Sequence, residues 1–298
     1  MAEHPFPRRL RHLLEYAVVR VLLALFASMP LDRASALGAR IGRLIGPRLG
    51  ISARARANLG RAMAELGPAE IERVVIGMWD NLGRVIAEYP HLGGFDLYGG
   101  DGRVEVVGIE HIDRLRDDGI GAIFFSGHIG NWELASLGGT QRGMPLVHVY
   151  RVANNPHVER LIQRMRAPIG GSHHPKGGRG ARALLAALGR GEHLGLLIDQ
   201  KLNEGIAVPF FGRDAMTAPA LAELALRFRV PIVPARVERL DGARFRLTVM
   251  APLELPDSGD RDADVLAIMT RVNALLESWI RDRPEQWLWL HRRWPKDG

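Results

Sequence analysis

His128 and Glu133 have the residue types and the spacing of an acid–base pair. They lie in GAIFFSGHIGNWELA, residues 121–135, where an apolar run ends in Ser-Gly and a helical pattern begins. A glutamate in the first helical turn can accept the imidazole N–H and leave the other nitrogen as a general base. We therefore expect Glu133 to orient His128. The alternative at this point is a glutamate favoured only by the helix dipole, beside a histidine used in packing.

Two further strand-like runs end in residues that bear chemistry. The run ending at Tyr150 is followed by Arg151, and a later run ends in Asp199 and Gln200. Ligands of open α/β sheets collect at the carboxyl ends of strands. Backbone N–H groups at a helix start near Asn131 would point to the same place. We expect all of these residues to share one site with the histidine.

The elements that must position these residues form two regions. Residues 8–90 are rich in Ala, Leu and Arg and predict helices between proline and glycine breakers. After residue 100, β-rich and helical runs alternate, which predicts an α/β fold with a mixed, mostly parallel sheet flanked by helices. The expected strands are 104–107, 122–125, 146–150, 194–198, 232–237 and 245–250. The expected helices are 109–118, 131–142, 155–167, 179–190, 218–229 and 261–281. The segment 170–180 predicts a mobile surface loop.

Several sequence blocks occur together in a characteristic order. The pair His128 and Glu133 forms a His-x4-Glu motif, and Arg166 lies further along the chain. The remaining blocks are YRVANNP (150–156), IDQK (198–201), VPFFG (208–212), VPIVP (230–234) and PEQWLWLHRRW (284–294). Together they resemble the late acyltransferases of lipid A biosynthesis, the lauroyl- and myristoyl-transferring branch of the lysophospholipid acyltransferase superfamily. The resemblance covers nearly the whole chain, although Val152 stands where that branch often has proline.

The resemblance implies a glycerolipid-acyltransferase-like fold and an O-acyl transfer. A fatty acyl chain would pass from acyl carrier protein to a hydroxyl of a lipid A precursor, with no metal and no bound cofactor. His128 would take the hydroxyl proton, and backbone N–H groups, Arg151 or both would stabilise the oxyanion. Arg151 and Arg166 could equally bind an acceptor phosphate. Asp199 would hold an arginine or bind sugar hydroxyls. The further candidates for substrate contact are Asn155, Tyr150, Gln200 and Asn131.

The N-terminal region carries most of the positive charge. The chain has a net charge of +7, whereas residues 1–62 alone hold eleven arginines and three acidic residues. The apolar run from Val21 to Leu31 is too short to predict a spanning helix. Basic residues beside a long apolar stretch instead favour an amphipathic helix bound to anionic membrane lipids. The resemblance implies that this membrane is the inner membrane and that the helix lies on its cytoplasmic face. We therefore divide the chain into a membrane-associating helix, 1–30, and an acyltransferase domain, 31–298, with a helical entry region at 31–100 and the catalytic core at 101–298.

Two other features favour simpler interpretations. The chain has no cysteine, which excludes disulfides, thiolate zinc sites and acyl-cysteine intermediates. His173 and His174 lack a metal-binding motif, and we assign them to the loop. Lys176 and Arg179 in the same loop could contact a substrate phosphate. Apart from the resemblance, the last block, with Trp287, Trp289 and His291 alternating with leucines, has the pattern of a strand packed on the core. Its tryptophans could also anchor the protein at a membrane-facing edge.

Three alternative functions stay open on the sequence alone. One is a glycerophospholipid acyltransferase that uses acyl-CoA or acyl carrier protein, and a mannoside acyltransferase is a variant of it. The third is a non-catalytic basic protein that binds membrane or nucleic acid. It leaves His128, Glu133 and Asp199 unexplained, and no aromatic residue for base stacking lies between Arg33 and Arg61. We expect no nucleic-acid partner.

Overall fold

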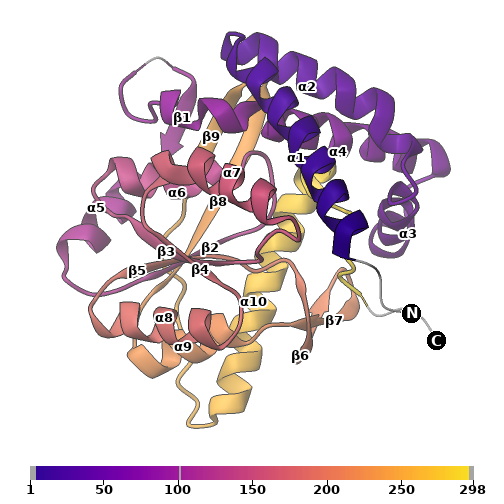
Figure 1. The fold of residues 1–298 in the computed structure, drawn as a ribbon. Helices are drawn as coiled ribbons and strands as arrows, with labels where there is room; N and C mark the ends of the chain where they lie inside the picture. The colour runs from indigo at the N-terminus through magenta and orange to yellow at the C-terminus, as the bar shows by residue number, and fades with distance from the viewer. Residues whose placement is uncertain (1–4, 101, 295–298) are drawn as a thin grey trace.

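The computed structural model of the chain describes residues 5–100 and 102–294. The first stretch is helical, and its helices gather at the upper right of Figure 1. They are α1 (Pro5–Ala27), α2 (Leu31–Ile45), α3 (Ser52–Ala62) and α4 (Pro68–Glu88), with 3-10 turns at Gly46–Arg48 and Tyr89–Gly94. Within the described residues, no helix combines the length and the apolar character needed to cross a bilayer.

The second stretch alternates strands and helices. In chain order these are β1 (Val104–Val107), α5 (Ile109–Asp117), β2 (Ile123–Ser126), α6 (Glu133–Gln141), β3 (Leu146–Tyr150), α7 (Pro156–Arg166), β4 (Ser172–Pro175), α8 (Gly178–Gly189), β5 (His193–Leu197), β6 (Lys201–Phe210), β7 (Arg213–Thr217), α9 (Ala220–Phe228), β8 (Ile232–Asp241), β9 (Arg244–Val249) and α10 (Arg261–Asp282). Short 3-10 turns lie at Ala167–Ile169 and Pro284–Gln286.

Seven strands form one mixed, mostly parallel sheet, as the sequence predicts. Their order is β1-β9-β8-β2-β5-β3-β4. The strands β8, β2, β5, β3 and β4 run parallel, whereas β9 is antiparallel to β8 and β1 follows the direction of β9. Strands β6 and β7 form a separate antiparallel hairpin. The parallel run places the carboxyl ends of β2, β5 and β3 side by side, where a site is expected.

Helices cover both faces of the sheet, and each face buries its own core. Apolar residues of α8, α9, α10 and the 284–294 segment pack on one face. Apolar residues of α5 and α6 pack on the other. Because successive side chains of a strand point to opposite faces, Phe124 belongs to the α6 side and Phe125 to the α8–α9 side.

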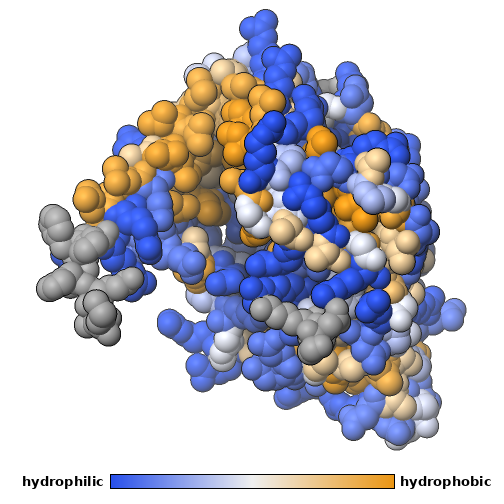
Figure 2. Space-filling view, turned by 90° about the vertical axis from the view of Figure 1, so that its right-hand side faces the viewer, coloured by the Kyte–Doolittle hydropathy of each residue, from blue (hydrophilic) through white to orange (hydrophobic). Residues whose placement is uncertain are grey.

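Helix α1 is apolar on two faces. Its inner face buries Leu23 and Phe26 against Ala34, Ala87 and residues of α7. Its outer face exposes a row of large apolar side chains at helical spacing, namely Leu10, Leu13, Leu14, Val18, Val21, Leu22 and Leu25. Figure 2 shows apolar side chains gathered over this helix at the upper left of the view. The inner face explains how the helix is held, whereas the outer face has no partner within the described residues.

Two expectations about local structure are wrong. The segment 170–180 is not simply a loop, because Ser172–Pro175 pairs with β3 as the edge strand β4. Gly170 and Gly171, with φ of 69° and 66°, turn the chain back onto the sheet at a point where a Cβ on Gly171 would meet the Leu146 carbonyl oxygen at 2.0 Å. The 284–294 segment is not a strand, since it contributes one isolated bridge, between Ile129 and Trp287.

Candidate active site

His128 forms its hydrogen bonds with Asp199. The imidazole Nδ1 lies 2.8 Å from Asp199 Oδ1, and the His128 backbone N–H donates to Asp199 Oδ2 at 2.7 Å. The two residues follow β2 and β5, which are neighbouring parallel strands, so their loops meet at one edge of the sheet. An ionised carboxylate at Nδ1 fixes the tautomer, with the proton on Nδ1 and the lone pair on Nε2.

The Asp199 carboxylate is fully buried and held by three donors. Trp287 Nε1 donates to Asp199 Oδ2 at 2.7 Å, in addition to the two bonds from His128. Burial alone would raise the pKa of Asp199, but the charge and hydrogen bonds of His128 lower it below the ordinary range. Asp199 is therefore ionised at neutral pH and can stabilise an imidazolium on His128.

The expected contact between Glu133 and His128 is replaced by a different pair. Glu133 Oε1 accepts hydrogen bonds from Arg166 Nε at 3.0 Å and Nη2 at 2.5 Å, and a further bond from the Tyr89 hydroxyl. The reason is which elements lie next to Glu133 and next to His128. The end of α4 brings Tyr89, and the end of α7 brings Arg166, to the first residue of α6, while β5 brings a different carboxylate to the histidine.

The charge of Glu133 keeps Arg166 protonated although the pair is largely buried. The Glu133 and Arg166 side chains are 7% and 19% exposed. Burial would lower the pKa of Arg166, but the Glu133 carboxylate raises it above its ordinary value. Burial and the Glu133 charge raise the pKa of Tyr89, so its hydroxyl keeps its proton and donates it. The Arg166 guanidinium therefore uses its Nε and Nη2 donors on Glu133 and Tyr89.

A buried polar network fixes the loop between His128 and α6. Arg239 on β8 forms a two-pronged ion pair with Glu88, with Nη1–Oε1 and Nη2–Oε2 distances of 2.6 and 3.0 Å. Asn131 donates to Glu88 Oε2 at 2.9 Å, and Asn81 donates to the Gly130 carbonyl at 3.0 Å. Asn131 is completely buried, so the structure uses this candidate to hold the loop.

Gly130 is required where this loop turns. Its φ is +59°, and a Cβ there would meet the Val237 carbonyl oxygen at 2.6 Å. A side chain would therefore be strained and would also clash with β8.

The 284–294 segment completes the surroundings of His128. The Leu288 N–H donates to the His128 carbonyl at 3.2 Å, and the His291 ring centroid lies 5.2 Å from that of His128. The Gln200 amide nitrogen lies 3.5 Å from His128 Nε2 and 3.4 Å from His291 Nε2. Burial, followed by the charge of His128, lowers the pKa of His291 to about 4, so His291 is neutral at physiological pH.

Trp287 and His291 are site residues that reasoning from the sequence missed. Both lie in a block whose alternation is also that of an ordinary packed strand. The one signal that could have marked them is a histidine within a run of buried tryptophans, a polar group that needs a reason to be there.

The arginine and asparagine of the YRVANNP block have different surroundings. Arg151 is exposed and lines the same pocket as His128. Asn155 caps α7 by accepting from the His157 and Val158 N–H groups, at 3.0 and 3.5 Å. Its amide donates to the His12 carbonyl of α1 at 2.8 Å. Asn155 thus joins α1 to α7 and does not line the pocket.

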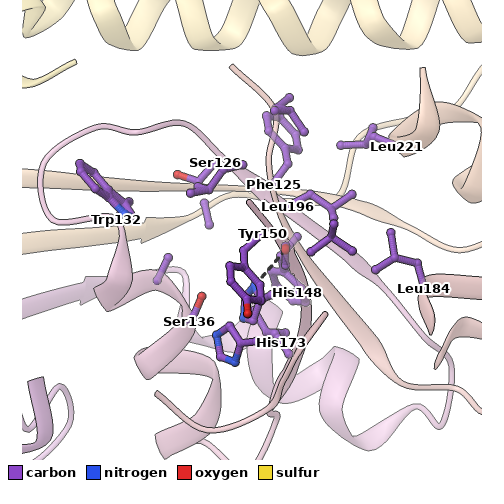
Figure 3. A pocket seen from close by; sticks show the side chains of 18 of the residues that line it. Phe125, Ser126, Trp132, Ser136, His148, Tyr150, His173, Leu184, Leu196 and Leu221 are labelled. Atoms are coloured by element: carbon purple, nitrogen blue, oxygen red, sulfur yellow. Dashed lines mark hydrogen bonds between the residues drawn. The ribbon is translucent and has the colours of Figure 1, made fainter. Parts of the chain in front are cut away.

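The candidate residues surround one mostly apolar pocket of about 590 Å³. Of the candidates, Tyr150, Arg151, Arg166 and Gln200 line it together with His128 and Glu133, whereas Asn131, Asn155 and Asp199 do not. Tyr150 donates to Glu159 at 2.8 Å, and burial with this bond raises the pKa of Tyr150. Figure 3 shows Tyr150 beside His148 and His173.

The predicted loop histidines belong to this pocket in part. The His173 ring stacks on that of His148, with centroids 4.9 Å apart. His173 and Lys176 line the pocket, and His174 is bonded to the Ser172 hydroxyl at 3.2 Å. Arg179 is exposed at the start of α8. Across residues 5–100 and 102–294, no three His, Asp or Glu side chains are grouped to hold a metal ion.

The sequence is similar to named bacterial proteins. The profile of a family described as bacterial lipid A biosynthesis acyltransferases matches residues 3–296. A lipid A biosynthesis acyltransferase of Haemophilus influenzae is 26% identical over 204 residues, which make up 66% of this chain and 61% of that protein, less than two thirds of its length. A lipid A biosynthesis myristoyltransferase of Escherichia coli is 27% identical over 85% of this chain and 78% of its own length. An E. coli lauroyltransferase is 29% identical, with 79% and 76% covered.

Proposed function

The chain belongs to the family of bacterial lipid A biosynthesis acyltransferases, and from that premise we propose that it moves a fatty acyl chain from acyl carrier protein to a hydroxyl of a lipid A precursor. The observation that carries the mechanism is the pairing of His128 Nδ1 with the buried Asp199 carboxylate. This pairing leaves Nε2, on the pocket side, as the proton acceptor.

The proposed reaction is a direct transfer. His128 Nε2 takes the acceptor's hydroxyl proton while the hydroxyl oxygen attacks the thioester carbonyl carbon. The tetrahedral intermediate collapses with breakage of the C–S bond, and the imidazolium returns the proton to the departing thiolate. Asp199 stabilises the imidazolium throughout. The Gln200 side-chain amide lies 3.5 Å from His128 Nε2 and can donate a hydrogen bond to the developing oxyanion. We assign the stabilisation of the oxyanion to Gln200 and Arg151 together.

The second carboxylate has a positioning role in this proposal. Glu133 and Tyr89 hold Arg166 at the pocket wall, where its charge faces the acceptor. Arg151 and Lys176 line the same pocket and add exposed positive charge for an acceptor phosphate. Asp199 now has the role of orienting His128, in place of the arginine or sugar contact considered for it.

We place the protein at the cytoplasmic face of the inner membrane, and helix α1 supports the association with a membrane. Its outer face exposes Val21 by 67% and Leu14 by 60%, and Arg8, Arg9 and Arg11 lie in its N-terminal half. Such a face inserts at the boundary of headgroups and acyl chains. The Asn155 bond to α1 joins this helix to the segment that carries Arg151, so a lipid acceptor would reach the pocket from the bilayer surface.

Acyl transfer from lauroyl-acyl carrier protein to two acceptors tests the proposal. Full-length protein in mixed micelles is offered a lipid A precursor or lysophosphatidic acid, and products are identified by mass spectrometry. We expect acylation of the lipid A precursor and a loss of about 10²–10⁴-fold in His128→Ala. His174→Ala, on β4 and outside the pocket, is the matched control and retains the wild-type rate. Equal or faster acylation of lysophosphatidic acid would replace the proposal with the glycerophospholipid alternative.

A further inference from the structure

The pocket divides between the two faces of the sheet. Its lining includes Phe124 and His148, which point to the α6 face, and Phe125 and Leu196, which point to the α8–α9 face. In Figure 3, Ser136, His148, Tyr150 and His173 form one group, and Phe125, Leu184, Leu196 and Leu221 form another. The pocket therefore has two branches that meet at the carboxyl ends of β2, β5 and β3, beside His128.

Small residues leave room for the branch under α6. Helix α6 presents Ala135, Ser136 and Gly139 to the pocket, and β5 presents Gly195. A Cβ on Gly195 would meet the His148 ring at 2.3 Å, so a larger residue would push this ring into the branch. Ala135 and Ser136 line the pocket and are only partly buried.

The register of the strands measures the depth of this branch. Its lining begins at the level of Ser126 and Leu197 and reaches Leu146, which pairs with His193 four residues down β5. At a rise of about 3.3 Å per residue, the branch is about 13 Å deep. Such a depth accommodates an extended acyl chain of medium length.

The branch on the other face is shallow. Its sheet lining includes the row formed by Phe125, Leu196 and Val149. The next row down, formed by Ile123, Leu194 and Val147, is absent from the lining. The helices above it show the same limit, because Leu184 and Leu221 line the pocket whereas Leu188 and Leu224, one turn further on, do not.

The deep branch ends in a closed apolar floor. Met144, Leu146 and Ile112 line its lower part and are 2%, 4% and 2% exposed. His148 stands halfway down. Burial, followed by the charge of His173, lowers the pKa of His148 to about 4. A neutral imidazole here carries no charge into contact with an alkyl chain.

We propose that the donor's acyl chain lies in the branch under α6, with its methyl end at Met144 and Leu146, and that Ser136 and Met144 set the accepted chain length. This inference rests on the proposed acyl transfer. Each methylene that loses its place in the branch weakens binding about fourfold, from about 0.8 kcal/mol per buried CH₂. A filled branch should thus favour short chains, and a branch opened at its floor should favour long ones.

Chain-length profiles of two opposite variants test the proposal. Octanoyl, decanoyl, lauroyl, myristoyl and palmitoyl thioesters of acyl carrier protein are compared one at a time with a lipid A precursor. Ser136→Leu places a branched side chain in the branch and should shift the preferred donor to a shorter chain, by about tenfold or more in relative kcat/KM. Met144→Ala opens the floor and should shift the preference to a longer chain.

The control lies on the other branch. Ala181→Leu adds the same kind of side chain to α8 and should leave the profile unchanged. A shift in Ala181→Leu with none in Ser136→Leu and Met144→Ala would move the acyl chain to the α8–α9 side and overturn the proposal. Unchanged profiles in all three variants would also overturn it. Failure of the proposed function is a separate result, because the wild-type protein would then transfer no chain of any length.

Discussion

Each of two buried carboxylates in the pocket region has its own basic partner. Asp199 is bonded to the imidazole that we propose as the base, whereas Glu133 is bonded to a guanidinium and a phenol. The difference assigns different kinetic effects to the two residues. Loss of Asp199 removes the stabilisation of an imidazolium that forms only during reaction, and such a loss lowers kcat.

We predict that Asp199→Asn lowers kcat about 10³–10⁴-fold, because the amide holds the wrong tautomer of His128. The KM of the acceptor should change little. Initial rates over a range of acceptor concentrations measure both values, and circular dichroism checks that the variant is folded. A kcat within threefold of wild type would contradict the assigned role.

We predict a second residue effect in acid stability. His148 and His291 both have a pKa of about 4 in the folded chain, below the ordinary 6.5. Between these values the unfolded chain binds more protons, so the free energy of unfolding falls as pH falls. From pH 7 to pH 5 each histidine should cost about 2 kcal/mol. Asp199 remains ionised in this window, since its pKa is lowered.

Urea unfolding at pH 7 and pH 5 measures this effect. His148→Gln should lose about half of the difference that the two histidines produce. His174→Gln, an otherwise similar change on β4, should retain it. An unchanged pH dependence in His148→Gln would show that His148 does not titrate in this way.

The sequence singled out His128 as a candidate but predicted the wrong hydrogen-bond partner for it. A spacing of five residues makes Glu133 a natural candidate, and its helix start was predicted within two residues. The true partner is 71 residues away and depends on β5 lying beside β2. Strand order is a tertiary property, and no local spacing records it.

At the scale of elements, α3 holds the 284–294 segment in place. The Asn58 side chain donates to the Trp289 and His291 carbonyls, each at 2.7 Å, and Arg54 donates to the Leu290 carbonyl at 3.1 Å. A helix from the N-terminal region therefore fixes the backbone of a residue that lies beside His128.

We predict that Asn58→Ala lowers the free energy of unfolding by about 1–3 kcal/mol, because one buried and one partly buried carbonyl lose their donor. The rate of acyl transfer should fall with it, as His291 is no longer held beside His128. Thermal unfolding and initial rates are measured on the same sample. Asn203→Ala, at an exposed site on β6, should change neither.

The elements themselves were largely predictable. All six expected strands occur, because β-branched and apolar runs bounded by turns carry a strong signal. Strand β4 was missed, since SHHP has little apolar character and pairs at the sheet edge only after two glycines turn the chain. The β6–β7 hairpin was missed because the first half of β6, KLNEG, is largely polar and is exposed or partly exposed.

At the scale of the whole molecule, one face of α1 packs against the rest of the protein, and we propose that the opposite face binds lipid. Removing residues 1–30 would also uncover the residues that Leu23 and Phe26 cover, among them Ala34, Ala87 and Met165. Substitutions on the outer face separate the two roles. We predict that the triple change Leu14→Glu, Val18→Glu and Val21→Glu weakens binding to phosphatidylglycerol vesicles at least tenfold, because apolar insertion is lost.

Flotation with vesicles measures the bound fraction. Ile120→Glu with Leu240→Glu, at exposed apolar sites outside α1, is the control and should bind like wild type. High salt should release the wild-type protein only in part, because screening weakens the arginine contacts and not the apolar ones. Unchanged binding by the triple variant would show that α1 does not mediate membrane association.

The bridge between Ile129 and Trp287 has a consequence for the order of synthesis. A ribosome that has reached residue 283 has already made His128, Asp199 and every residue of the pocket lining. The Asp199 carboxylate still lacks its Trp287 donor at that moment, and the His128 carbonyl lacks the Leu288 N–H. The growing chain thus contains all of the proposed reactive groups before the hydrogen bonds that position them can form. We expect catalysis to begin only when residues 284–294 emerge, long after α1 has had the opportunity to reach a membrane.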